Sequence, residues 1–122
     1  MTKKKILVVE DEESILKLQS ILLTIRGYTV EGAMDGQAAL EAVVTMDPDL
    51  ILLDIMLPKI DGLEVCRQVK ANVATRHIPI IMVTAKKSEE DLVMGEKAGA
   101  DMYITKPYKL SMVIENIQRL LP

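Results

Sequence analysis

Short apolar runs alternate with longer amphipathic segments along the chain. Continuous apolar runs without polar alternation are typical of strands that are buried on both faces of a parallel sheet. Such runs cover residues 6–9, 50–53 and 78–84, and two further strand candidates lie at 28–33 and 102–105. We therefore expect five strands, and we expect the less apolar 28–33 strand at an edge of the sheet.

Each strand candidate is followed by a segment with the pattern of a helix. These segments cover residues 14–26, 36–46, 63–69, 88–98 and 110–121. The apolar stripe of the first consists of Ile15, Leu18, Leu22 and Ile25, and in the second we expect Ala38, Leu40, Val43 and Val44 to face inward. Strands that alternate with helices of this length imply right-handed crossovers. The pattern predicts an α/β fold with a parallel sheet and helices on both of its faces.

Composition narrows the class of protein. The 122 residues suit one domain, and no apolar stretch approaches the length of a membrane span. Cys66 is the only cysteine, so an internal disulfide and a cysteine-based zinc site are excluded. With no secretion signal in the sequence, we expect a cytoplasmic protein. The net charge of −3 gives no overall reason to expect direct binding to nucleic acid.

Polar residues end or directly follow four of the five strand candidates. Glu10 and Asp11 follow the first, Asp54 the third and Lys106 the fifth, while Thr84 ends the fourth. Parallel strands bring these positions to one rim of the sheet, where ligands of open α/β sheets bind. Taken alone, Asp54 is equally suited to capping the turn that follows it. Three clustered carboxylates without histidine or cysteine favour a Mg²⁺ site instead.

The same residues form an ordered set of motifs. The set consists of Val8-Val9-Glu10-Asp11-Glu12, Leu53-Asp54-Ile55-Met56-Leu57-Pro58 with Asp61-Gly62, Val83-Thr84-Ala85, and Lys106-Pro107. This chain resembles the receiver domains of bacterial two-component response regulators over essentially its whole length. The resemblance implies one receiver domain over residues 1–122. It also implies a doubly wound, flavodoxin-like fold with five helices and strand order 2-1-3-4-5.

The resemblance assigns expected roles to individual residues. Asp54 matches the phosphoacceptor, which takes a phosphoryl group from a histidine kinase, a phosphotransfer protein or a small phosphodonor. Asp11, Asp54 and the backbone carbonyl of Met56 match Mg²⁺ ligands, and Glu10 is expected to act mainly through water. Thr84 and Lys106 are expected to neutralise phosphoryl charge, and the Lys106–Pro107 peptide is expected to be cis. The domain would assist its own phosphorylation and dephosphorylation without being a turnover enzyme.

The resemblance also implies an output face. Tyr103 matches the switch aromatic that responds to Thr84, although shielding of the sheet edge is a compatible role for this tyrosine. The expected partner face joins the helix that opens at Ser88, the 102–105 strand and the last helix. The last helix has a wide apolar arc, which consists of Met112, Val113, Ile114, Ile117, Leu120 and Leu121. This arc either deepens the core or leaves an exposed part that binds a second copy of the chain or a downstream effector. A stand-alone regulator and a receiver cut from a longer protein both suit this sequence.

Two other classes of protein share parts of this pattern. A Mg²⁺-dependent phosphohydrolase of the haloacid-dehalogenase type would carry a second aspartate two residues after Asp54, where this chain has Met56. A flavodoxin-like flavin-binding module would have a phosphate loop after the first strand. The acidic residues 10–13 would repel a phosphate there.

Overall fold

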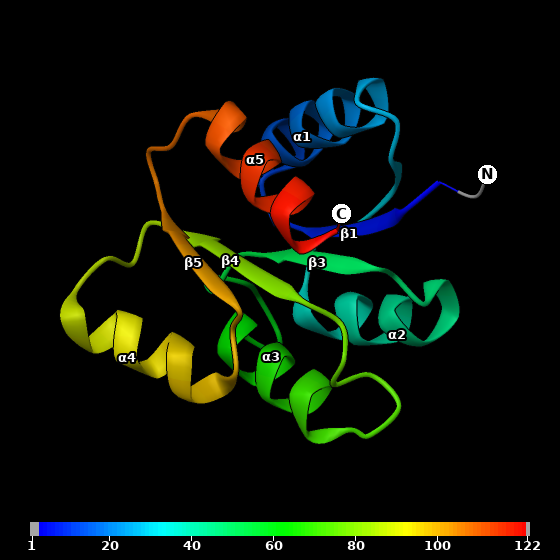
Figure 1. The fold of residues 1–122 in the computed structure, drawn as a ribbon. Coiled ribbons are helices and arrows are strands. Elements are labelled where there is room, and N and C mark those ends of the chain that lie inside the picture. Colours follow the sequence, from blue (N-terminus) through cyan, green and yellow to red (C-terminus); the bar gives the residue numbers. More distant parts are fainter. Residues whose placement is uncertain (1–2, 122) are drawn as a thin grey trace.

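A computed structural model describes residues 3–121 and shows one five-stranded sheet (Figure 1). All neighbouring strands are parallel, in the order β2-β1-β3-β4-β5. The strands are β1 (Lys5–Val9), β2 (Thr29–Ala33), β3 (Leu50–Leu53), β4 (Ile80–Thr84) and β5 (Met102–Thr105). The expected strand order is confirmed, and β2 lies at an edge as its weak apolar pattern predicted.

Within the described residues, five helices cover both faces of the sheet (Figure 1). They are α1 (Glu13–Ile25), α2 (Gly36–Met46), α3 (Gly62–Ala71), α4 (Glu89–Ala98) and α5 (Leu110–Leu120). One core cluster joins the sheet to α1 and α5, and a second joins it to α2, α3 and α4. This is the doubly wound α/β architecture that the alternation of strands and helices predicted.

The continuous apolar runs are explained by this two-layered core. All four residues of β3 are buried, and successive side chains enter opposite layers. Leu50 and Leu52 pack in the α1/α5 layer, whereas Ile51 and Leu53 pack in the α2/α3/α4 layer. Because neither face of this strand meets solvent, no polar alternation is needed.

The face that α1 turns toward the sheet differs from the expected one. Of the predicted apolar stripe, Ile15 and Leu22 are half-buried, but Leu18 and Ile25 are 58% and 72% exposed. The row that faces the sheet consists instead of Leu16, Gln19 and Leu23. The polar Gln19 interrupts this row, so a search for apolar periodicity selects the wrong face.

The inward face of α2 is also displaced from the expectation. Val43 and Ala39 are buried, and Leu40 is half-buried, but Val44 is exposed. Residues 43 and 44 are adjacent on a helix and point about 100° apart, so only one of them can face the core directly. The inward position of Val44 was therefore a wrong prediction.

Most of the wide apolar arc of α5 deepens the core. Val113, Ile114 and Ile117 are buried, while Leu120 and Leu121 are half-buried. Met112 is the member of the arc that reaches solvent, with 44% of its surface exposed. The exposed part of the arc is thus a single methionine.

No helix within residues 3–121 is long and apolar enough to cross a bilayer.

Candidate functional site

The sheet register brings the ends of β1 and β3 together. Val9 pairs with Leu53, and the N–H of Asp54 donates to the carbonyl of Val9 at 3.1 Å. Glu10 and Asp54 are the next residues of these two strands, so their side chains meet at the carboxyl rim of the sheet. That rim is the ligand-binding edge of open α/β folds.

Three carboxylates converge at this rim. Glu10, Asp11 and Asp54 each offer an oxygen, and these oxygens all lie within 4.8 Å of one another. Glu10 and Asp54 are buried, whereas Asp11 is exposed. Burial raises the pKa of Glu10, and the nearby charge of Asp54 adds to the effect, although hydrogen bonds from Lys106 and the Glu12 N–H oppose it. Ionised carboxylates in this arrangement favour a bound cation.

Lys106 supplies one such positive charge. Its Nζ lies 3.0 Å from Oε1 of Glu10 and 3.1 Å from Oδ2 of Asp54. Burial alone would lower the pKa of Lys106, but its hydrogen bonds and charge interactions with the two carboxylates outweigh this and raise the pKa. The Lys106 N–H also donates to the Thr84 carbonyl at 2.8 Å, and the Lys106–Pro107 peptide is cis as predicted.

The loop after β3 fixes the other side of the Asp54 carboxylate. The N–H of Met56 donates to Oδ1 of Asp54 at 3.1 Å, while the Met56 side chain is exposed. The start of α3 passes so close that a Cβ on Gly62 would lie 2.1 Å from the Asp54 carbonyl oxygen. Glycine is therefore required at position 62 for this loop to approach the site.

The loop after β4 connects Thr84 to Tyr103. Thr84 is fully buried, and its hydroxyl accepts a hydrogen bond from the Lys86 N–H at 3.4 Å. The Tyr103 hydroxyl donates to the carbonyl of the same residue, Lys86, at 2.8 Å. The two expected switch residues thus both hydrogen-bond to the backbone of Lys86, Thr84 to its N–H and Tyr103 to its carbonyl.

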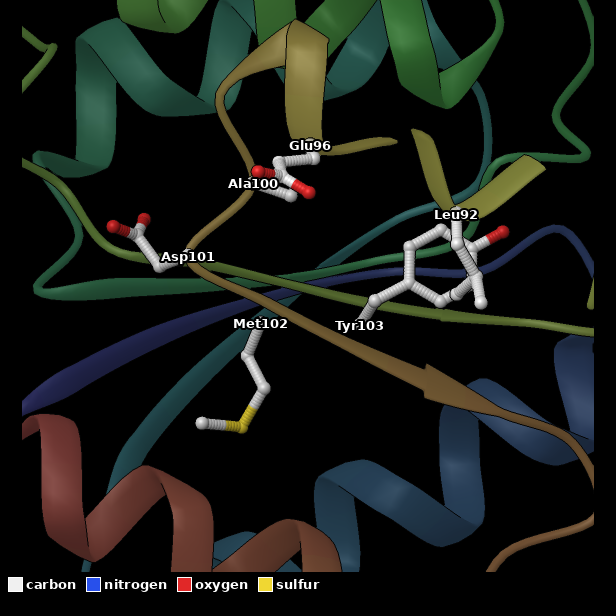
Figure 2. A pocket seen from close by; sticks show the side chains of 6 residues that line it. All are labelled: Leu92, Glu96, Ala100, Asp101, Met102 and Tyr103. Atoms are coloured by element: carbon white, nitrogen blue, oxygen red, sulfur yellow. The ribbon is translucent and has the colours of Figure 1, made fainter. Parts of the chain in front are cut away.

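A cavity of about 450 Å³ lies between α4 and β5, with the Tyr103 ring in its wall (Figure 2). It is lined by Leu92, Glu96, Ala100, Asp101, Met102 and Tyr103. Figure 2 shows Met102 pointing away from Leu92, toward the layer that contains α5. Because Leu92 and Glu96 belong to α4, the cavity lies on the α4 side of the edge strand β5.

The sequence analysis did not identify one pair of residues near the acid cluster, Gln19 and Tyr108. Gln19 of α1 is buried, and its Nε2 donates a hydrogen bond to the hydroxyl of Tyr108, two residues after Lys106. The available signal was a glutamine in a helical row with Leu16 and Leu23. This row can be recognised as the inward face of α1 only if a buried polar residue is accepted within it.

The donor set of the acid cluster fits a hard divalent cation. It consists of carboxylate oxygens, two of them buried, without histidine or cysteine in the cluster. Oxygen ligands of this kind suit Mg²⁺ better than zinc or copper. The cluster therefore has the chemistry expected of a magnesium site.

Known proteins share this fold and sequence pattern. The alkaline phosphatase synthesis transcriptional regulatory protein PhoP of Bacillus subtilis (strain 168) is 48% identical over 118 residues, 97% of this chain and 48% of that protein. The DNA-binding dual master transcriptional regulator RpaA of Synechocystis is 39% identical over 117 residues, 96% of this chain and 48% of that protein. The chain thus spans about half the length of these curated relatives.

Solved structures agree with the sequence relatives. A CheY-like response regulator receiver domain protein from Methanospirillum hungatei JF-1 has a TM-score of 0.91 and 33% identity, covering 97% of this chain and 93% of that chain. The BeF3-activated N-terminal receiver domain of Klebsiella pneumoniae RstA has a TM-score of 0.90 and 30% identity, with coverage of 97% and 98%. A family model described as the response regulator receiver domain matches residues 6–118. The chain belongs to the response regulator receiver domain family, a family of signalling proteins of two-component systems.

Proposed function

We propose that residues 1–122 form a phosphoacceptor domain in which Asp54 takes a phosphoryl group from a histidine kinase or a phosphotransfer protein. The position of the Asp54 carboxylate carries this proposal. It is 6% exposed at the end of β3, and it accepts hydrogen bonds from the Lys106 ammonium and the Met56 N–H. Oδ1 of Asp54 caps the following turn through the Met56 N–H, while Oδ2 faces the Lys106 ammonium, and this second contact supports the proposed role of the carboxylate as a nucleophile.

The proposed reaction transfers one phosphoryl group. A carboxylate oxygen of Asp54 attacks phosphorus, and the bond from phosphorus to the donor's imidazole nitrogen breaks, so that the imidazole leaves with the electron pair. Negative charge on the transferred oxygens must be stabilised during this step. Lys106 already lies 3.1 Å from Asp54, and the buried Thr84 hydroxyl is proposed as a second donor. The domain would thereby assist its own phosphorylation and later dephosphorylation.

Glu10, Asp11 and Asp54 would hold a Mg²⁺ ion at this site. The backbone carbonyl of Met56 is proposed as a further ligand, and Glu10 would contribute mainly through water. A bound Mg²⁺ supplies charge neutralisation on phosphoryl oxygens. The three carboxylates, whose oxygens lie within 4.8 Å of one another, support this assignment.

The proposed output runs from Thr84 to Tyr103 and then to the surface formed by α4, β5 and α5. The hydrogen bonds of Thr84 and Tyr103 to Lys86 support this route. The surface would bind a downstream effector or a second copy of the chain after phosphorylation. The net charge of −3 favours a protein over nucleic acid as the direct partner of this domain.

Fluorine NMR with beryllofluoride and Mg²⁺ tests the proposed phosphoacceptor. We expect a bound fluoride signal that depends on Mg²⁺ and is lost in Asp54→Asn. The matched control is Asp61→Asn, which changes an exposed carboxylate that caps α3. The control should keep the signal. An equal signal from Asp54→Asn would contradict the proposal.

A further inference from the structure

Among residues 3–121, four polar or charged side chains are buried, and three of them already have a role in the proposed phosphoryl transfer. These three are Glu10, Asp54 and Thr84, and the fourth is Gln19 of α1. A buried amide is costly unless it makes a hydrogen bond. The burial of the Gln19 amide therefore has to be explained, whereas the burial of the apolar residues in the same row does not.

The hydrogen bond of Gln19 leads directly to the segment that carries Lys106. Its amide donates to the hydroxyl of Tyr108, and this ring packs against the α1/α5 core layer. Gln19 also borders a narrow void that Glu10 and Asp54 share. The amide thus lies behind the acid site and holds the chain just beyond the lysine.

Tyr108 and Leu110 pack against the α1/α5 core layer, but few hydrogen bonds hold the segment from Lys106 to the start of α5. The Lys106 N–H is held by the Thr84 carbonyl, but β5 ends at Thr105. At the other end, the N-cap residue Lys109 makes no side-chain capping hydrogen bond. The link between Gln19 and Tyr108 is therefore a side-chain restraint in the middle of this turn.

We propose that Gln19 is a positioning residue for phosphoryl transfer, acting through Tyr108 to keep the Lys106 ammonium between Glu10 and Asp54. This inference rests on the proposed function of Asp54. Lysine side chains have many rotamers, so a fixed backbone reduces the positions that the ammonium can reach. Small displacements of a charged group from the reacting atoms lower the rate of transfer.

The test compares Gln19→Leu, Tyr108→Phe and the double variant. The observed quantity is the rate constant for phosphorylation by acetyl phosphate at saturating Mg²⁺, followed by intact mass, with melting temperature measured in parallel. Each single variant should melt at a lower temperature and react about two- to tenfold more slowly, the equivalent of one hydrogen bond. The double variant pairs two apolar groups, so its melting temperature should recover while its rate stays low.

The double variant separates positioning from a structural role. If the hydrogen bond only stabilises the fold, the rate will recover together with the melting temperature, and the inference is wrong. Gln37→Leu, which alters an exposed glutamine on α2, is the matched control and should react like the wild type. A wild-type chain that forms no adduct would overturn the proposed function itself. A wild-type adduct with unchanged rates in all variants would overturn only the role of Gln19.

Discussion

The Tyr103 hydroxyl donates a hydrogen bond to the Lys86 carbonyl oxygen across 2.8 Å. The other side of the Lys86 segment is tied to the acid site, because its N–H donates to the Thr84 hydroxyl. A displacement of Thr84 would therefore be transmitted to Tyr103 through one residue. Such a route requires two arrangements that differ by only a few kcal/mol.

Replacement of Thr84 by alanine tests this route. Thr84→Ala should still accept a phosphoryl group on Asp54, because its hydroxyl is not the nucleophile. Phosphorylation-dependent chemical-shift changes around Tyr103 should be strongly reduced, because the hydrogen bond to Lys86 is lost. Thr45→Ala, at an exposed position on α2, is the control. Full-size changes at Tyr103 in Thr84→Ala would show that the hydroxyl is not the link.

Gly95 should limit the positions open to the Tyr103 ring. A Cβ on Gly95 would lie 2.7 Å from two ring carbons of Tyr103. Glycine to alanine in a helix interior normally stabilises by about 1 kcal/mol. We expect Gly95→Ala to lose this gain or to destabilise, and to displace the ring. In a Tyr103→Ala background, Gly95→Ala should instead stabilise the protein, because the ring is absent. Urea unfolding measures the free energy of unfolding in both backgrounds. A gain in stability of equal size in both would show that Gly95 and the Tyr103 ring are not in close contact.

The Cys66 thiol should be nearly inert in the folded protein. Burial raises its pKa from 9.0 to about 11. The pKa in the folded state lies above the unfolded value, so the folded protein favours the protonated thiol. The contribution of Cys66 to the free energy of unfolding is therefore fully present below about pH 9 and is lost as the pH rises through about 11. Alkylation with iodoacetamide at pH 8.5 should be slow in buffer and fast in urea. Rapid alkylation of the native protein would mean that the thiol is exposed.

A charge at Met112 should disturb the proposed partner surface. We expect Met112→Lys to block any phosphorylation-dependent self-association or effector binding and to leave phosphorylation of Asp54 unchanged. Sedimentation with and without beryllofluoride measures the association. Val44→Lys, on the exposed face of α2, is the matched control. Loss of association in Val44→Lys but not in Met112→Lys would show that the partner surface does not include α5.

The strands and the acid cluster were accessible from sequence because each has a local signal. Buried parallel strands require continuous apolar runs, and the strand order implied by the family resemblance makes β1 and β3 neighbours, which places Glu10 beside Asp54. The inward face of α1 had no such signal. It is chosen by the fit of the whole helix against the sheet, which buries Gln19 and leaves Ile25 exposed.

The close contacts around the site were also beyond sequence reasoning. The need for glycine at position 62 depends on the path of the backbone next to Asp54, and the pairing of Gln19 with Tyr108 joins residues 89 positions apart. Local periodicity carries no information about either relation. Both follow from the tertiary packing of helices at the carboxyl rim.

Location of the phosphoryl group on the chain tests the central claim most directly. The protein is incubated with Mg²⁺ and acetyl phosphate, and the modified residue is identified by intact mass and peptide mapping. We predict one phosphoryl group on Asp54, formed only with Mg²⁺ and absent from Asp54→Asn. No adduct on the wild type, or an adduct at another residue that persists in Asp54→Asn, would contradict the assignment of Asp54 as the phosphoacceptor.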